Sequence, residues 1–523
     1  MAGPDLLIVG AYIAAMLGLS AWLARGQTGS SDYYLGGRRL PWWALGLSTL
    51  ATQSSANSFI GIPAFVALVP GGGLTWLQYE LALPLALLVV MLLFVPVFRG
   101  LGIVSIYEYL ELRFDRGTRL LLSAVFLGTR ALASGVALYA AAVVLQVCTG
   151  LPLAACVLGL GVATVAYDTM GGMRAVVWTD VLQMALLLVG VLLCIFWAVA
   201  EVGGTQAVLA AVDPARLAAI DPGHGLGDGA RAPLWGFVIG GVVLYVAYYG
   251  VDQSQVQRQL AAGSVADAQR LLLFNGIVRF PLTLLYAALG LALAAVWAGS
   301  PALRAAVPAD RLDFLVPRYI ELHLPVGVRG LLVAAILAAA MSSLDSSLNS
   351  LSAATLRDFL ARRVRPERHL TASRLCTLGW GVVIIAVGLH AGDLASSVVE
   401  AINRVGALFY GPLLAAFACG VCDPRARGAA VRWGVAAGLA ANLLLWALLG
   451  PALFWMWWNV SGLIVAAAVT ALLSRLMPVT PATTPGLRWQ RSAWSTLPRG
   501  AAWALLGWTG LVAAVLALLG SRA

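Results

Sequence analysis

The sequence predicts an all-α polytopic membrane protein with about fourteen membrane-spanning helices. Its 523 residues are 61% hydrophobic and only 11% charged. Apolar runs of about 20 residues, long enough to cross a bilayer, recur along the whole chain. Polar stretches interrupt three of these runs at membrane depth, where exposed backbone is tolerated only against protein or a water-filled cavity.

The first expected span covers about residues 5–24. We expect a retained helix rather than a signal peptide, because the run lacks a positive leader and reaches Arg25 without an obvious cleavage site. The remaining spans are expected near residues 42–66, 75–98, 118–147, 151–169, 174–200, 233–257, 266–298, 327–356, 371–391, 395–421, 428–449, 452–474 and 499–519.

Polar breaks set the expected organisation of the chain. One break lies at residues 51–58 in the second span, and another lies at residues 248–255 in the seventh. Broken helices five spans apart are typical of a five-plus-five inverted repeat with a binding site near the midplane. The expected units are 1–40 (first helix and cytoplasmic connection), 41–200 (first repeat), 201–232 (extracellular connection), 233–421 (second repeat) and 422–523 (three additional helices).

Arginine placement predicts the orientation. The chain has a net charge of +10 and no lysine, and its arginines concentrate in connections on one side of the predicted membrane. By the positive-inside rule that side is cytoplasmic, so both termini lie outside, with the protein multi-pass in a plasma (inner) membrane. Charges spread over short connections do not indicate a nucleic-acid partner.

The residue pattern of the sequence also disfavours an enzyme. The six cysteines are scattered and the four histidines form no metal-ligand group, so we expect no transition metal and no cofactor. No nucleophile and base stand together in the sequence.

The ninth span carries hydroxyl groups on one helix face. Ala339, Ser342, Ser343 and Ser346 are spaced i, i+3, i+4 and i+7. Hydroxyl and carbonyl oxygens are hard ligands that suit a small alkali cation. The alternative is that small residues here only allow close helix packing in lipid.

Several motifs resemble one transporter family. They are Asp32 to Arg38 (DYYLGGR), Phe59 to Gly61 (FIG), Tyr107 to Tyr109 (YEY), Gly171 to Gln183 (GGMRAVVWTDVLQ), Gln255 to Arg258 (QVQR) and Ala339 to Asn349 (AAMSSLDSSLN). Together they resemble the sodium/solute symporter family, which includes sodium-coupled sugar, sialic acid, proline and monocarboxylate carriers, over about residues 5–420. The resemblance implies a leucine-transporter-type fold with alternating access and sodium as the coupling ion.

The resemblance also implies ion ligands. The main sodium site would use the carbonyls of Ala51, Ser54 and Ala339 with the hydroxyls of Ser342 and Ser343. A second sodium site would use Asp180, Ser342 and Ser346, with Asp345 in place of the usual hydroxyl. Because two close carboxylates do not ionise together easily, one of them holding a proton is the alternative. For Asp180 the further alternative is a simple pair with an arginine.

Solute-binding candidates follow from the same resemblance. They are Gln53, Ser55, Ser58, Glu80, Arg130, Asp252 and Gln255. Glu80 matches an acid that contacts sugar in galactose carriers, or is a solvated residue at the outer interface. Asp252 stands where those carriers have asparagine, and Gln255 where they have a gating tyrosine, which argues against a copy of a sugar site.

Arg130 lies in an apolar stretch of the fourth span. A guanidinium at that depth suits a bidentate clamp on a substrate carboxylate. The alternatives are a salt bridge with Asp252 or Glu80, or a side chain that snorkels to the interface.

The resulting functional hypothesis is sodium-coupled symport of a small organic solute into the cell, with a carboxylate as one candidate. The alternatives are a proton-coupled symporter of the same fold, or a non-transporting sensor or channel on this scaffold. The expected partners are the solute, sodium and the lipid bilayer, and the expected assembly is a monomer or a loose oligomer.

Overall fold

The computed structural model describes residues 1–27, 29–391, 398–477 and 487–521, and within them all regular secondary structure is helical. Among these described residues, ten helices are long and apolar enough to cross a membrane, and three shorter apolar helices accompany them. The expected span at 395–421 begins outside the described residues; its helix is described from Val398.

The α-helices, in chain order, are α1 Gly3–Leu23, α2 Ser30–Leu35, α3 Trp42–Gln53, α4 Ala56–Ala67, α5 Ala82–Leu93, α6 Val95–Gly100, α7 Tyr107–Arg113, α8 Arg116–Thr149, α9 Leu153–Val202, α10 Thr205–Ala211, α11 Gly241–Val251, α12 Gln253–Ala261, α13 Val265–Gly299, α14 Pro301–Ala306, α15 Leu315–His323, α16 Val328–Ala354, α17 His369–His390, α18 Val398–Cys422, α19 Gly428–Leu449, α20 Trp457–Leu476 and α21 Ala501–Gly520. A 3₁₀ segment, η2 Leu74–Leu81, precedes α5, and π-helical turns η4 Gly236–Gly240 and η6 Thr355–Leu360 adjoin α11 and α16.

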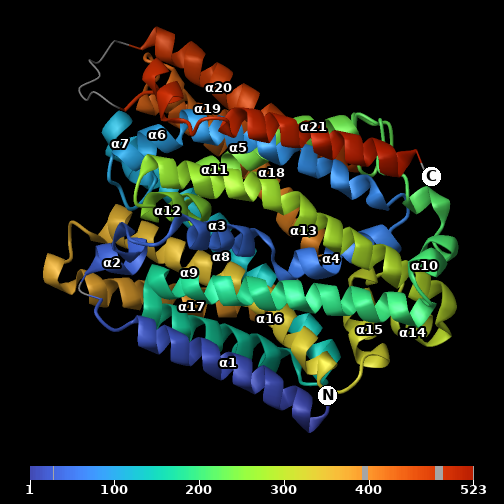
Figure 1. Cartoon of the computed structure of the whole chain (residues 1–523). Helices are drawn as coiled ribbons and strands as arrows, with labels where there is room; N and C mark the ends of the chain where they lie inside the picture. The colour runs from blue at the N-terminus through green and yellow to red at the C-terminus, as the bar shows by residue number, and fades with distance from the viewer. Residues whose placement is uncertain (28, 392–397, 478–486, 522–523) are drawn as a thin grey trace.

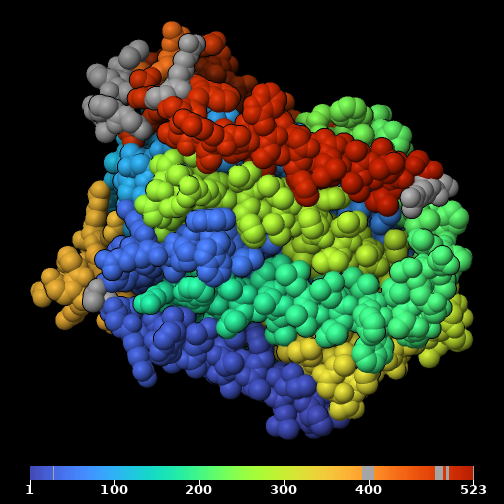
Figure 2. All heavy atoms as spheres, in the orientation of Figure 1, coloured from blue at the N-terminus to red at the C-terminus, as the bar shows by residue number. Residues whose placement is uncertain are grey.

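The long helices pack side by side as a bundle. Figure 1 shows α1, α9, α13 and α21 running between the same two ends, and α9 packs on α1 and α13. Short helices α2 and α7 lie at one end, whereas α10, α14 and α15 lie at the other, together with the start of α1 and the end of α21. In Figure 2, α21 (red) lies along the outer surface, where it packs on α5 and α13.

Two of the three expected interruptions are real breaks. The chain leaves helical geometry at Ser54 (φ −87°, ψ 67°), between α3 and α4, and at Asp252 (φ −87°, ψ 120°), between α11 and α12. The prediction was wrong for the ninth span, because α16 continues through its serines without a break. There the hydroxyls bond to the helix's own carbonyls, as Ser346 does to Ser342 over 2.7 Å, and this satisfies them without unwinding.

A sharp junction within α9 replaces the expected connection between the fifth and sixth spans. The element is 50 residues long, and Gly172 within it has φ 56° and ψ −160°. A Cβ on Gly172 would lie 2.5 Å from the carbonyl oxygen of Tyr33 in α2. Only glycine fits both the conformation and the contact.

Candidate ion and solute site

The break after α3 places main-chain oxygens against α16. Because Ser55 is extended (φ −72°, ψ 170°), the helix cannot continue past Gln53, and carbonyls of its last turn lose their helical partners. The Ser342 hydroxyl of α16 lies 3.2 Å from the carbonyl oxygen of Ala51 and 3.1 Å from that of Ala339.

Ser343 extends the same cluster of oxygens. Its hydroxyl lies 3.1 Å from the carbonyl oxygen of Thr52 and 3.4 Å from that of Ala339. Three carbonyl and two hydroxyl oxygens therefore meet between the broken helix and α16. Uncharged hard oxygens at a helix break suit a small alkali cation such as sodium. Thr52 was not among the residues predicted from the sequence.

Ser54 turns its side chain away from this cluster. Its hydroxyl accepts a hydrogen bond from Nη1 of Arg279 in α13, over 3.2 Å. Arg279 Nε lies 3.6 Å from Oε1 of Glu80, which also accepts from the Thr283 hydroxyl at 3.0 Å. Glu80 is only 1% exposed, so the interpretation of it as a solvated interface residue is wrong.

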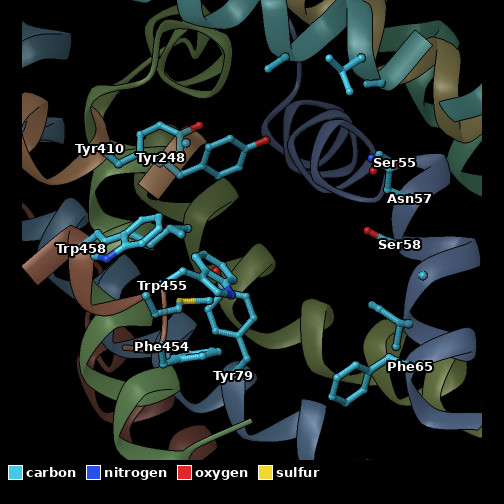
Figure 3. Close-up of a pocket in the computed structure, with 18 of the residues that line it drawn as sticks. Ser55, Asn57, Ser58, Phe65, Tyr79, Tyr248, Tyr410, Phe454, Trp455 and Trp458 are labelled. Carbon is cyan, nitrogen blue, oxygen red and sulfur yellow. The ribbon is translucent and has the colours of Figure 1, made fainter. Parts of the chain in front are cut away.

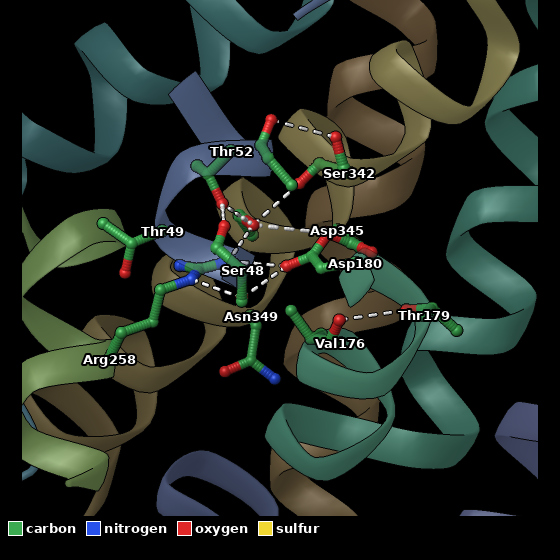
Figure 4. Close-up of polar contacts among 12 residues, drawn as sticks. Ser48, Thr49, Thr52, Val176, Thr179, Asp180, Arg258, Ser342, Asp345 and Asn349 are labelled. Atoms are coloured by element: carbon green, nitrogen blue, oxygen red, sulfur yellow. Dashed lines mark hydrogen bonds and ion pairs between the residues drawn. The ribbon is translucent and has the colours of Figure 1, made fainter. Parts of the chain in front are cut away.

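The Asp180 carboxylate is paired with a buried arginine. Its Oδ2 lies 2.5 Å from the Ser48 hydroxyl and 3.2 Å from Nη2 of Arg258 in α12. Arg258 also donates to the Ser346 hydroxyl through Nη2. Figure 4 shows Arg258 beside Ser48 and Asp180, and its Nε donates to the Ser48 hydroxyl. The guanidinium thus holds two of the residues expected at a second sodium site, as the arginine-pair alternative for Asp180 predicts.

Asp345 has a different environment. It is fully buried on α16, and its Oδ2 accepts a hydrogen bond from the Tyr167 hydroxyl over 2.7 Å. Its Oδ1 lies 3.2 Å from the hydroxyl of Ser346. Among the described residues, no arginine forms an ion pair with this carboxyl group.

A cavity of about 1140 Å³ opens beside the oxygen cluster. Thr52 and Ser343 of the cluster line its wall, together with Gln53, Ser55 and Ser58 from the expected solute site. Figure 3 shows Ser58 of α4, and Ser55 just before that helix, facing an aromatic wall across the open space. This wall consists of Tyr79, Tyr248, Tyr410, Phe454, Trp455 and Trp458.

Two connections also contribute residues to the cavity wall. Residues 225–231, which precede α11, and residues 309–313, which precede α15, line it. The cavity therefore extends to the connections that precede α11 and α15.

Arg130 lines the cavity and forms an ion pair there. It donates through Nη2 to Oδ2 of Asp252 and, over 2.6 Å, to the hydroxyl of Ser254. The Tyr410 hydroxyl donates to the same Asp252 oxygen at 3.2 Å. The alternative of an Arg130–Asp252 salt bridge is therefore confirmed, and the pair stands at the cavity wall, within reach of a solute.

Gln53 and Gln255 differ in their access to the cavity. Gln53 lines the cavity and accepts a hydrogen bond from Tyr249. Gln255 is fully buried, and its amide donates over 2.9 Å to the hydroxyl of Tyr248, a residue that lines the cavity. Arg279 also lines the cavity and was missed in the sequence, where an arginine deep within the eighth span, well past Arg270 at its start, was the available signal.

Comparison with known proteins decides the family. A model of the "Sodium:solute symporter family" matches residues 33–438. The chain belongs to the sodium:solute symporter family. It is a membrane transporter that couples a solute to sodium, and it is not an enzyme.

Three relatives illustrate the family's range of solutes. The human sodium/iodide cotransporter is 34% identical over 84% of this chain and 69% of its own length. Human sodium-coupled monocarboxylate transporter 1 is 31% identical over 82% of this chain and 71% of its own. The sodium/sialic acid symporter SiaT of Proteus mirabilis is 29% identical over 88% of this chain and 93% of its own.

Solved structures agree on the fold. A Na⁺-coupled sialic acid symporter, in a substrate-bound outward-open state, superposes with a TM-score of 0.82 and 27% identity, covering 91% of this chain and 98% of that one. Mhp1, a nucleobase-cation-symport-1 family transporter in a closed conformation, gives a TM-score of 0.55 at 11% identity, covering 88% of this chain and 98% of that one. The leucine-transporter-type fold expected from the motifs is confirmed.

Proposed function

We propose that this symporter carries a small organic carboxylate into the cell, driven by one sodium ion bound between α3 and α16. The observation that carries the proposal is the position of the oxygen cluster of Ala51, Thr52, Ala339, Ser342 and Ser343 at the wall of a cavity that also presents Arg130. An ion at the wall of a solute cavity can stabilise the same conformation that binds the solute.

Sodium would act by joining two helices. In the structure, the hydroxyls of Ser342 and Ser343 donate to the carbonyls of Ala51 and Thr52. An ion coordinated by all of these oxygens replaces weak neutral bonds with stronger ion–dipole contacts, and so fixes the broken helix in its cavity-forming position. By linkage, the solute must then raise the affinity for sodium by the same factor.

The anionic character of the solute rests on Arg130. Its guanidinium forms an ion pair with Asp252 at the cavity wall. A carboxylate solute can accept hydrogen bonds from the N–H groups that do not bind Asp252. The named solutes of the three relatives, namely iodide, monocarboxylates and sialic acid, are anions or acids. The aromatic wall supplies apolar contact for the rest of a small organic molecule.

We also infer the topology. The two halves of α9 on either side of Gly172, counted with the ten long and three short apolar helices among the described residues, support about fourteen crossings. The core then comprises repeats 41–200 and 233–421, flanked by 1–40 and 422–523 and joined by 201–232. By the positive-inside rule, the arginine placement favours both termini outside a plasma (inner) membrane. The protein works as a monomer or a loose oligomer.

Uptake into proteoliposomes tests the proposal. Vesicles holding the purified protein are given an inward sodium gradient, or choline at equal pH and ionic strength, with labelled lactate, pyruvate, sialic acid or glucose outside. Sodium-dependent accumulation of a carboxylate, and not of glucose, is expected. Accumulation that is equal in sodium and choline would contradict sodium coupling, and preference for glucose would contradict the carboxylate.

A further inference from the structure

An aromatic part of the cavity wall lies outside the two predicted repeats. Phe454 and Trp455 stand in the connection between α19 and α20, and both line the cavity. Their ring centroids lie 5.6 Å apart. Figure 3 shows Trp455 pointing from this connection toward the open space, beside Tyr79 of η2. The connection between α19 and α20 therefore gives the cavity an aromatic face of its own.

Ring contacts link this face to the cationic side of the cavity. Phe454 contacts Phe237, with 5.2 Å between centroids, and Phe237 stacks on Tyr79 at 5.3 Å. From Tyr79 the contacts continue through three tyrosines of α11, namely Tyr245, Tyr249 and Tyr248. Cζ of Arg130 lies 6.0 Å from the ring centroid of the last of these. An unbroken series of rings thus runs from the connection before α20 to Arg130.

The opposite wall closes on the same rings at one end. Phe65, farther along α4 than Ser58, lines the cavity (Figure 3) and contacts Trp76 of η2, with 5.1 Å between centroids. Trp76 in turn contacts Phe237 at 5.7 Å. The two walls therefore meet at an end where both sides are aromatic, whereas Ser58 keeps the α4 wall polar nearer the oxygen cluster.

The start of α20 is held closely against its neighbours. A Cβ on Gly240 of η4 would lie 2.7 Å from the carbonyl oxygen of Met456, so glycine is needed for this approach. The Trp457 indole donates over 2.9 Å to the carbonyl oxygen of His224. Trp455 precedes these two anchored residues, so a ring that binds against it does not have to order the wall first.

The cavity is larger than a short carboxylate needs. Its volume of about 1140 Å³ lies above the range of about 300–1,000 Å³ for pockets that enclose a drug-sized ligand. A three-carbon acid bound by Arg130 would leave the aromatic end in contact with water, which is unfavourable for apolar surface. A planar ring placed there would remove its own apolar surface and that of the wall from water, and would stack on the wall.

We propose that Tyr79, Phe454 and Trp455 form an aromatic subsite that binds a planar ring of the solute while Arg130 binds its carboxylate, so that the solutes of this symporter are aromatic carboxylates. The inference rests on the proposed function and narrows its solute class. Because part of the subsite comes from the connection between α19 and α20, helices outside the predicted repeats take part in choosing the solute.

Calorimetric titration of the purified full chain in sodium chloride tests the proposal. The ligands are lactate, then benzoate, phenylacetate and 3-phenylpropionate, which vary the spacing of ring and carboxylate, and the cyclohexyl counterpart of each. At least one aromatic acid should bind at least about tenfold more tightly than lactate, and about two- to tenfold more tightly than its cyclohexyl counterpart. Benzamide, which keeps the ring without the charge, should bind more weakly than benzoate.

The outcomes separate the subsite from the proposed function. Lactate bound as tightly as all three aromatic acids, or cyclohexyl acids bound as tightly as their aromatic counterparts, would overturn the subsite and leave carboxylate transport standing. Benzamide bound as tightly as benzoate would instead overturn the carboxylate and the role of Arg130. Failure of every acid to bind, lactate included, would overturn the proposed function itself.

Variants assign the preference to one ring. In Trp455→Leu the affinity for the best aromatic acid should fall at least about fivefold more than that for lactate. Trp455→Phe, which keeps a ring, should recover most of the loss. Trp433→Leu is the matched control, because that tryptophan of α19 is 66% exposed and does not line the cavity. An unchanged aromatic preference in Trp455→Leu, or an equal loss for lactate, would overturn the proposal. The wild-type ligand series decides it if Trp455→Leu does not fold.

Discussion

Ser342 on α16 donates its hydroxyl hydrogen to the carbonyl of Ala51 on α3, across 3.2 Å, although the two residues lie 291 positions apart in the chain. The contact depends on two local features. The break at Ser54 exposes the Ala51 carbonyl, and the unbroken course of α16 directs the serine at it. Neither helix alone forms the cluster. The affinity for an ion bound there would therefore depend on how α3 and α16 are placed relative to each other.

Removing one hydroxyl should weaken sodium binding. In Ser343→Ala the ion loses one of its expected oxygen ligands. A polar contact to a charged group contributes about 1.5 kcal/mol, so its loss should lower the apparent sodium affinity roughly tenfold. Sodium-dependent uptake, measured over a sodium series, checks this. Ser350→Ala is the control, because among the described residues that buried hydroxyl bonds only within its own helix, to the Ser347 carbonyl. Unchanged sodium dependence in Ser343→Ala would count against the site.

Replacing the cavity arginine should separate anionic from neutral solutes. In Arg130→Gln the bidentate donor is lost, so affinity for a carboxylate solute should fall by at least about tenfold while that for a neutral solute of similar size changes little. Competition against labelled uptake measures both. An equal loss for the two kinds of solute would remove the clamp from consideration.

The partner of Arg130 offers the converse test. In Asp252→Asn the amide can still accept from the main-chain NH of Ser254, which Asp252 Oδ1 does at 2.9 Å, so the start of α12 should survive. The guanidinium, however, loses its competing carboxylate. Carboxylate affinity should therefore rise relative to the wild-type chain. A fall of the kind seen for Arg130→Gln would mean that Asp252 holds Arg130 in its binding position.

Much of this architecture was predictable from the sequence because membrane burial leaves strong local signals. Expected spans at 118–147, 266–298 and 428–449 correspond to α8, α13 and α19 within a few residues. The oxygen cluster was predictable in outline, since the serine spacing on α16 and the polar break near Ala51 are both local patterns. The leucine-transporter-type fold followed from motifs rather than from periodicity.

Pairing between distant helices was harder to predict. Nothing in the local sequence shows that Arg258 reaches Asp180, or that Arg279 lies beside both Ser54 and Glu80, because each contact depends on the tertiary arrangement of separate spans. The continuous course of α16 was missed for a related reason. Serine hydroxyls can be satisfied within their own helix, so a polar stretch in a span does not require a break.

Breaking the buried pair of Asp180 and Arg258 should destabilise the protein strongly. Both side chains are almost fully buried, and among the described residues Arg258→Gln leaves the Asp180 carboxylate with only the Ser48 hydroxyl as donor. Loss of one partner of a buried pair costs about 3–5 kcal/mol. The midpoint of thermal unfolding should fall in each single variant, and the Asp180→Asn, Arg258→Gln double variant should lose less than the sum of the two. Strictly additive losses would show that the two groups act independently.

Substitution at the junction of α9 should be costly although it adds one methyl group. Gly172 has φ 56° and ψ −160°, a conformation available almost only to glycine, and the added Cβ would lie 2.5 Å from the Tyr33 carbonyl oxygen. Gly172→Ala should therefore destabilise the folded protein by at least about 1–3 kcal/mol, seen as a lower thermal midpoint and lower yield.

Gly159→Ala is the matched control for this junction. Gly159 lies in the same element, and a Cβ there would meet no atom within 4 Å. Alanine favours the helical conformation by about 1 kcal/mol over glycine. The Gly159→Ala variant should therefore be at least as stable as the wild-type chain. Equal behaviour of the two variants would mean that α9 can straighten at Gly172. In that case its two halves would be one flexible helix, and Tyr33 would not fix the angle between them.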